Sequence, residues 1–266
     1  MLQAHSLLWD YLWVGPNALL LVLAWLLWQR RIWRQNSAFL AFAIVSAVGD
    51  IAVFLADISP SVSAVNFWRV DWAYLFAESI LKFIVIGEVF SQLNRPYPSV
   101  SKLGRVVVSG VGAFLVLLAT LVAAFSRGDS SVRLISGAHL LEQIVFTVEL
   151  GLILVIFLFG AYFNLSWDRR SFGLLLGFGI SSCGHLAGWA ISANAAPSPH
   201  GRVLLDFLDM ATHHVCVLIW FYYLLIPKSG GATRPPKPPS AGAGSDESHK
   251  EHLEVWNREL ERLIHQ

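Results

Sequence analysis

The chain alternates between long apolar runs and short polar segments. A helix needs about 20 mostly apolar residues to cross a bilayer. Backbone groups in lipid must be hydrogen-bonded within the chain, so apolar runs of this length predict helices. Seven stretches qualify, at residues 11–28, 38–58, 68–93, 106–125, 138–167, 172–191 and 203–226. The pattern therefore predicts an all-α polytopic membrane protein, with a bundle of seven transmembrane helices over residues 1–227.

The third of these spans is the least apolar, because it carries Asp71, Glu78, Lys82 and Glu88. Rejecting it would leave six spans and a long apolar loop, which is harder to place in either lipid or water. We therefore keep it as a span and expect its charged residues to face the interior of the bundle.

Basic residues are unevenly distributed between the two sets of loops. The loops after the first, third and fifth spans carry eight Lys and Arg, and the opposite side carries four. Lys and Arg concentrate in cytoplasmic loops. This bias predicts an N-terminus outside the cell and a C-terminus in the cytoplasm.

The composition changes abruptly after the seventh span. Residues 228–248 are rich in Pro, Gly and Ser and are typical of a disordered linker. Residues 249–266 predict a short amphipathic helix, since apolar residues recur on one face at helical spacing. These residues are Leu253, Trp256, Leu260, Leu263 and Ile264. A helix this short is marginal alone, so we expect it to contact its own bundle, another protomer, a cytoplasmic protein partner or the membrane interface, with protein favoured over lipid.

Composition supports the membrane class and excludes others. Of the 266 residues, 55% are hydrophobic and 14% are charged, and the mean hydropathy is +0.57. Soluble proteins have about 25% charged residues, so a soluble enzyme is excluded. The net charge of +1 leaves no field that would attract nucleic acid. Two cysteines are too few for a disulfide framework.

Ionisable residues inside the spans are the main functional signal. Such residues are costly in lipid and usually face a bundle interior or a water-filled cavity. Helical phase places Asp71, Glu78 and Lys82 within about 40° of each other. With the predicted orientation, most of these groups fall in the outer half of the membrane. We expect one outward-facing polar cavity, for ligand binding or proton relay, formed by Asp50, Asp71, Glu78, Lys82, Glu142, Glu149, Asp209 and His213. Alternatively, the charges serve only to specify helix packing.

Several cofactor chemistries can be compared with this pattern. Retinal would need a Lys on the seventh span, which has none, so a retinal protein is not expected. Zinc is possible, with His185, His213 and Asp209 as candidate ligands. However, seven-helix zinc hydrolases carry HxxxH on the last helix, whereas this span reads DxxDxxxHH. A haem held by a pair of His residues is a further alternative.

The sixth span carries two pairs of glycines four residues apart. These pairs, Gly173 with Gly177 and Gly184 with Gly188, allow close approach of a neighbouring helix. We expect packing within the chain rather than a dimer face.

The residues also carry a resemblance to other membrane proteins. The stretches 157–180, 217–227 and 253–263 resemble a group of uncharacterised bacterial seven-helix membrane proteins, as do Glu78 and Glu88 in their surrounding sequence. The resemblance implies seven spans, a cytoplasmic terminal helix and a place in the bacterial inner membrane. It implies no activity, ligand or catalytic residue.

Together these patterns predict a receptor-like or sensory binding module with an outward-facing polar cavity. The terminal helix would transmit a signal to a cytoplasmic partner, because the sequence contains no output domain. No catalytic residue is predicted. The alternatives are an intramembrane metal-dependent hydrolase, a proton-coupled transporter and a structural membrane subunit.

Overall fold

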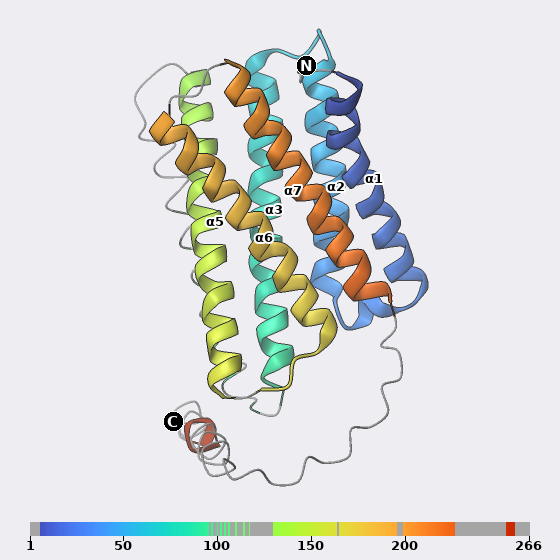
Figure 1. Ribbon diagram of the computed structural model, residues 1–266, viewed down its shortest axis with the longest axis vertical. Helices are drawn as coiled ribbons and strands as arrows, with labels where there is room; N and C mark the ends of the chain where they lie inside the picture. Colours follow the sequence, from blue (N-terminus) through green and yellow to red (C-terminus); the bar gives the residue numbers. More distant parts are fainter. Residues whose placement is uncertain are drawn as a thin grey trace.

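The computed structural model describes most of the apolar part of the chain. It covers residues 6–95, 97, 100, 102, 104, 106, 110, 114, 117, 130–163, 165–195, 199–226 and 254–258, with the backbone alone for 130–141, 193–195, 199, 200 and 202. All regular structure in this part is helical (Figure 1). The elements are α1 (Leu7–Gln29), a short 3₁₀ helix η1 (Ile32–Arg34), α2 (Ser37–Ile58), α3 (Ala64–Leu93), α5 (Ser130–Tyr162), α6 (Arg169–Ala195) and α7 (Pro199–Leu225).

Within the described residues, five helices are long and apolar enough to cross a membrane. They are α1, α2 and the apolar parts of α5, α6 and α7, at Glu142–Tyr162, Arg169–Ser192 and Val203–Leu225. These helices identify an integral membrane protein. The third predicted span forms helix α3 but is not among the five. Its charged residues, including Asp71, Glu78 and Lys82, lower its apolar content.

The sequence-based boundaries differ from the structure mainly between α5 and α6. The prediction that the fifth span continues to Trp167 was wrong, because α5 ends at Tyr162. The carboxylate of Asp168 accepts a hydrogen bond from the backbone N–H of Arg170, which starts α6 three residues earlier than predicted. The Trp167 ring instead packs 5.0 Å from that of Phe157. Most of the fourth predicted span, the linker at 228–248 and most of 249–266 lie outside the described residues.

The six long helices that are described form a closed ring. Following the contacts, α1 packs on α2, α2 on α3, α3 on α5, α5 on α6, α6 on α7 and α7 back on α1. Because every helix has two neighbours in the ring, each can turn one face to lipid and one to a shared interior. This arrangement gives α3 a place for its charged side chains away from lipid.

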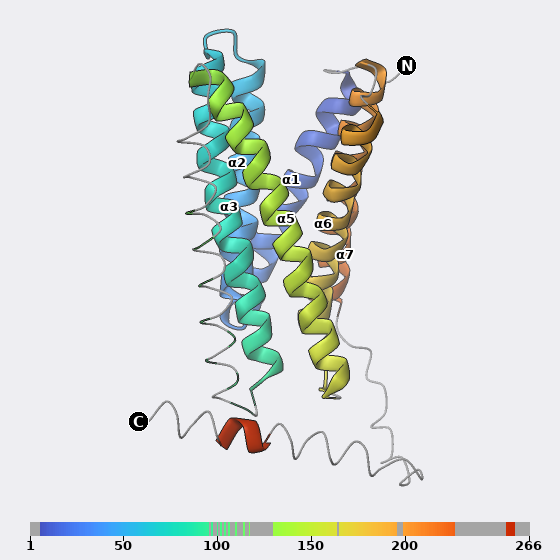
Figure 2. The same ribbon diagram turned by 90° about the vertical axis from the view of Figure 1, so that its left-hand side faces the viewer.

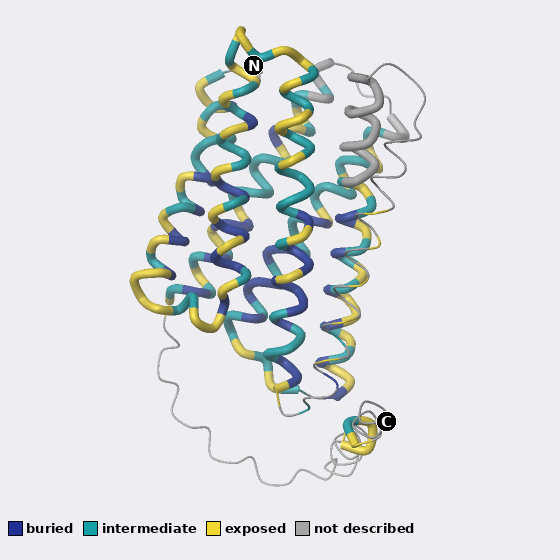
Figure 3. Tube along the Cα trace, turned by 180° about the vertical axis from the view of Figure 1, so that it is seen from behind, coloured by how far each residue is buried: buried dark blue, intermediate teal, exposed yellow. Residues whose placement is uncertain are grey.

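The buried apolar core lies in the half of the bundle away from the N-terminus (Figure 3). Four aromatic side chains from three helices meet there, and their rings pack mainly edge to face, the arrangement that aromatic quadrupoles favour. They are Phe39, Phe42, Phe178 and Trp220. Each of these side chains is at most 2% exposed. This half of the bundle is therefore dry and closely packed.

The glycines of α6 show where α6 and α7 come closest. A Cβ atom added at Gly173 would collide with Tyr223, and one added at Gly177 would collide with the Trp220 ring. At Gly184 an added Cβ would lie 2.8 Å from Thr212, and at Gly188 nothing lies within 4 Å. The prediction of packing within the chain is confirmed for the first three. The two helices thus diverge towards the C-terminal end of α6.

Seen from the side, the helices form two groups that separate towards the end of the bundle carrying the N-terminus (Figure 2). Helices α2, α3 and α5 lie on one side there, and α1, α6 and α7 on the other. The described part of the terminal helix, residues 254–258, lies near the opposite end. Its Trp256 is 58% exposed, and its ring centroid is 6.4 Å from that of Phe163, just after α5.

Candidate functional site: an acidic cavity in the open half of the bundle

A cavity of about 390 Å³ occupies the space between the six helices at the N-terminal end. We call it the acidic cavity. Its ionisable lining consists of six carboxylic acids, one lysine and two histidines, contributed by α2, α3, α5, α6 and α7. These residues are Asp50, Asp71, Glu78, Lys82, Glu142, His185, Asp206, Asp209 and His213.

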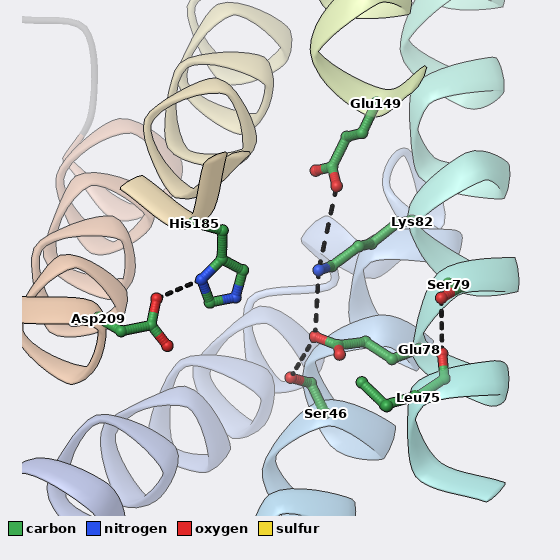
Figure 4. A network of polar contacts seen from close by, with 8 residues as sticks. All are labelled: Ser46, Leu75, Glu78, Ser79, Lys82, Glu149, His185 and Asp209. Atoms are coloured by element: carbon green, nitrogen blue, oxygen red, sulfur yellow. Dashed lines mark hydrogen bonds and ion pairs between the residues drawn. The ribbon is translucent and has the colours of Figure 1, made fainter. Parts of the chain in front are cut away.

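Lys82, which lines the acidic cavity, is at the centre of a polar cluster between Glu78 and Glu149 (Figure 4). Its Nζ atom lies 3.5 Å from Oε1 of Glu78, one turn earlier on α3, and 4.0 Å from Oε2 of Glu149 on α5. The Ser46 hydroxyl of α2 donates a hydrogen bond of 3.3 Å to the same Glu78 oxygen. The ammonium group also lies 4.5 Å from the centre of the Phe146 ring. Lys82 thus links α3 to α5 directly, and Glu78 extends the cluster to α2.

Glu149 is completely buried, at 0% exposure. Lys82 is the cation closest to it, and among the described residues neither Glu149 oxygen accepts a hydrogen bond within normal limits. A buried charge is stable only when it is paired. The Lys82 ion pair therefore holds Glu149 in place, and Glu149 lies behind the wall of the cavity rather than in it.

A second polar network involves Asp50 on α2. The indole N–H of Trp13 donates to Oδ1 of Asp50 at 3.3 Å, and the amide of Asn17 donates to Oδ2. The Asn17 amide also donates to the Trp13 carbonyl at 2.7 Å, so both donors come from one turn of α1. Asn17 is 1% exposed. This network connects α1 to α2 beside the cavity and fixes the orientation of the Asp50 carboxylate.

The third network connects α6 and α7. Nδ1 of His185 pairs with Oδ1 of Asp209, and the His185 ring lies edge-on to Phe146, with centroids 3.9 Å apart. A larger hollow of about 790 Å³ between α6 and α7 shares Glu142, His185, Asp206 and Asp209 with the acidic cavity. The His185–Asp209 pair therefore stands at the boundary between the two spaces.

His213 lies on the α7 wall of the acidic cavity. Its Nε2 atom is buried and has no hydrogen-bond partner in the part of the chain that the structure describes. The next residue, His214, turns away, and its ring lies 5.9 Å from that of Tyr11. Only one of the two adjacent histidines therefore contributes to the cavity.

Aromatic rings form much of the remaining wall. The six aromatic residues are Trp9, Trp13, Phe67, Trp68, Tyr74 and Phe146. Ring faces attract cations, and proteins use them to recognise quaternary ammonium ligands. A cavity with more acids than bases and with aromatic walls is thus electrostatically suited to a positively charged solute.

Seven of the eight residues predicted for ligand binding or proton relay line this one cavity, and the eighth, Glu149, contacts it through Lys82. The haem alternative would use a pair among His139, His185 and His213, and the side chain of His139 lies outside the described residues. The three candidate metal ligands share the cavity wall, but His185 and Asp209 pair with each other. Among the described residues, no three His, Cys, Asp or Glu side chains converge closely enough to hold a metal ion. The zinc site stays a prediction without geometric support.

Sequence reasoning missed the contribution of α1. Trp13 and Asn17 sit in the first predicted span, residues 11–28, which contains no Asp, Glu, Lys, Arg or His, so no charge pattern marked them. An Asn in the middle of a predicted span was the available signal, because an amide in lipid needs a partner. Comparison with known proteins adds no further residue: no family model matches the chain, and no curated protein or solved structure matches it.

Proposed function

We propose that this protein is a receptor-like binding module of the bacterial inner membrane, and that its acidic cavity takes a small cationic solute from outside the cell. The observation that carries the proposal is the lining of the cavity, where six carboxylic acids and six aromatic residues surround a single lysine. The volume of about 390 Å³ falls in the range of small-molecule sites, roughly 300–1,000 Å³.

The positions of the acids favour a cation over a neutral solute. Lys82 is already paired with Glu78 and Glu149, so it offers little to an anion. Asp206 and Asp209 lie three residues apart on α7 and face the same space. Bringing a positive charge between them and the aromatic walls relieves the repulsion between like charges. An organic ammonium ion uses both features, because it pairs with a carboxylate and stacks on a ring.

The orientation and the output are part of the proposal. Charge in the loops supports an external acidic cavity and a cytoplasmic terminal helix. Helices α6 and α7 both contribute to the cavity wall, and they are separated at this end of the bundle. A ligand that draws them together here would also change how they pack at the opposite end. The terminal helix, with an exposed Trp256, is suited to pass such a change to a partner protein.

The test uses the full chain in an uncharged detergent, with choline as the probe. Choline should raise the thermal unfolding midpoint in a saturable way, because a ligand that binds only the folded state stabilises it. Its uncharged carbon isostere, dimethylbutanol, should have no effect, and sodium and magnesium should have little. Asp209→Asn and Trp13→Leu should each weaken choline binding. Asp57→Asn, an exposed acid outside the cavity, is the matched control.

Two outcomes would contradict the proposal in different ways. Equal shifts with choline and dimethylbutanol would mean that the cavity binds apolar solutes without regard to charge. The second outcome is an unfolding midpoint that simple metal ions raise equally in the unchanged protein and in Trp13→Leu. It would mean that the carboxylates bind inorganic cations and the rings do not take part.

A further inference from the structure

A second cavity lies at the other end of the bundle and has the opposite charge. It encloses about 720 Å³ between the end of α1, the start of α6 and the end of α7. We call it the arginine cavity. Its charged lining consists of Arg30, Arg169 and Arg170, with Asp168 as the one acid. None of these residues takes part in the proposed cation binding, and the inference drawn from them rests on the proposed function only for the cytoplasmic placement of this end of the bundle.

The three guanidinium groups are held in place by hydrogen bonds. Arg30 donates to the Leu225 carbonyl at 3.1 Å, and Arg169 donates to the carbonyls of Ile226 at 2.8 Å and Tyr222 at 3.2 Å. Tyr222 and Leu225 belong to the last turn of α7 and Ile226 follows it, where backbone carbonyls lack the next turn of helix as a partner. The Tyr222 carbonyl also accepts a hydrogen bond of 3.4 Å from the Ile226 backbone N–H. Arg170 donates to the Gln35 side chain at 3.0 Å.

These hydrogen bonds use only part of the N–H groups of the three guanidinium groups. A guanidinium carries five N–H groups in a rigid fork, whereas the bonds above take two from Arg169 and one each from Arg30 and Arg170. The Arg169 guanidinium also lies 4.7 Å from the centre of the Tyr222 ring and 5.5 Å from that of Tyr223. The arginines are thus held in position, and contacts with the described residues leave some of their N–H groups unused.

The balance of charge in this cavity stays positive. The carboxyl end of α7 contributes about half a negative charge, and the amino end of α6 contributes a similar positive one. The negative charge of Asp168 offsets one of the three positive charges. Its carboxylate already accepts a hydrogen bond from the Arg170 backbone N–H. Three cations therefore exceed the local negative charge. Clustered arginines match the geometry of phosphate and carboxylate oxygens, to which they donate charge-assisted hydrogen bonds.

We propose that the arginine cavity binds a phosphate group, supplied by the headgroup of an anionic phospholipid. The surroundings favour a lipid over a soluble phosphate. Tyr222 is 52% exposed and Ile226 is 48% exposed beside the cavity, and Trp167 and Phe172 form part of its wall. Exposed apolar residues beside aromatic rings are typical of the boundary between lipid and water. Basic pockets between helices on the cytoplasmic side suit anionic headgroups.

The experiment measures binding to the full chain in an uncharged maltoside detergent. Three probes are compared at equal ionic strength: phosphatidylglycerol, phosphatidylcholine and inorganic phosphate. Phosphatidylglycerol should bind in a saturable way and raise the unfolding midpoint. Phosphatidylcholine, which has no net charge, and inorganic phosphate, which lacks acyl chains, should bind at least about tenfold more weakly.

Variants then assign the binding to this cavity. Arg169→Gln and Arg170→Gln should each weaken phosphatidylglycerol binding about tenfold, since each removes charge-assisted donors. Arg34→Gln removes the same charge at the same end of the molecule but outside the cavity, and should change the affinity little. Arg170→Gln keeps all the α7 carbonyl bonds, so it tests the site even where Arg169→Gln prevents folding.

Several results would overturn the proposal. Equal binding of phosphatidylglycerol and phosphatidylcholine would show that the headgroup charge is not recognised. An equal loss of phosphatidylglycerol affinity with Arg34→Gln would show a diffuse effect of positive charge rather than a defined binding site. If inorganic phosphate bound as tightly as phosphatidylglycerol, the proposal that a lipid supplies the phosphate group would be wrong, and a soluble phosphate would take its place.

Discussion

The two halves of the bundle accommodate polar groups in different ways. In the half that holds the N-terminus, acids are partnered by side chains of other helices, as in the contacts of Glu149 with Lys82 and of Asp50 with Asn17. In the other half, Arg30 and Arg169 are partnered by backbone carbonyls at the end of α7. The pairing of the acids depends on all the helices being present. The pairing of the arginines needs only the end of α7 and its neighbours.

The packing of the helices differs in the same way. Around Phe42 and Trp220 the core is dry, and glycines bring α6 against α7. Near Gly188 the same two helices have separated, and the space holds the acidic cavity and the adjoining hollow. The closed half is stabilised by apolar packing, whereas the open half is stabilised by ion pairs and hydrogen bonds around a space between all six helices. The changes below test this division, in order of decreasing effect.

Replacing Lys82 with Met should have the largest effect. It removes the one cation from a buried cluster and leaves Glu78 and Glu149 facing each other unpaired. Breaking a buried ion pair in this way costs about 3–5 kcal/mol of the free energy of unfolding. Unfolding in mixed detergents that contain dodecyl sulfate would measure the loss. Lys102→Met, on an exposed lysine, should be close to neutral.

A second variant checks that charge is the cause. Lys82→Met combined with Glu149→Gln should recover part of the lost stability, because the neutral amide removes one unpaired acid. A double variant less stable than Lys82→Met alone would mean that Glu149 contributes through packing and not through its charge.

Asn17→Leu should come next. It removes the amide that donates to Asp50 and to the Trp13 carbonyl, and hydrogen bonds to a charged group contribute about 1.5–3 kcal/mol. The same unfolding measurement applies. Gln143→Leu, on an exposed face of α5, makes the same chemical change where lipid is the neighbour. If both variants unfolded alike, the network between α1 and α2 would have no special role.

Gly177→Ala should destabilise the closed half. The added methyl group would collide with the Trp220 ring, and overpacking of this kind costs about 1–3 kcal/mol. Gly188→Ala places the same methyl group on the same helix in open space, so it should be neutral or slightly stabilising. Equal effects at the two positions would contradict the separation of α6 and α7 along the bundle.

Glu88→Gln should have the smallest effect. Glu88 accepts a 3.0 Å hydrogen bond from the backbone N–H of Ala38, in the first turn of α2. Gln keeps an acceptor but removes the negative charge at the helix N-terminus, a loss of about 0.3–1 kcal/mol. Asp57→Asn removes a charge near the other end of α2, where a carboxylate is unfavourable. The two variants should therefore move the unfolding free energy in opposite directions.

The helices could be predicted from local pattern because each apolar run must satisfy its own backbone in lipid. The end of α5 could not, because Trp167 is apolar by composition and leaves the helix only through contact with Phe157 and the start of α6 at Asp168. Helical phase placed Glu78 and Lys82 on one face correctly, since four residues make about one turn.

Contacts between residues from distant segments could not be predicted from local patterns. No spacing in the sequence relates Asn17 to Asp50, Lys82 to Glu149, or His185 to Asp209. The sequence-based grouping of these acids assumed that all inward faces meet in one space. Whether they do depends on the order of the helices around the ring and on how far α6 and α7 diverge, which are properties of packing and not of single helices.

By itself, the sequence of this protein determined an integral membrane class, the helical state of its apolar runs and the uneven placement of its charges. These follow from local chemistry, because lipid enforces hydrogen bonding within each helix and excludes unpaired charge. Only the tertiary structure decided that Asp50, Glu78 and Asp209 line one cavity with Trp13, while Arg30, Arg169 and Arg170 line another at the opposite end. The physical reason is that burial and pairing of a charge depend on neighbours from other helices, and those neighbours come together only when the bundle closes.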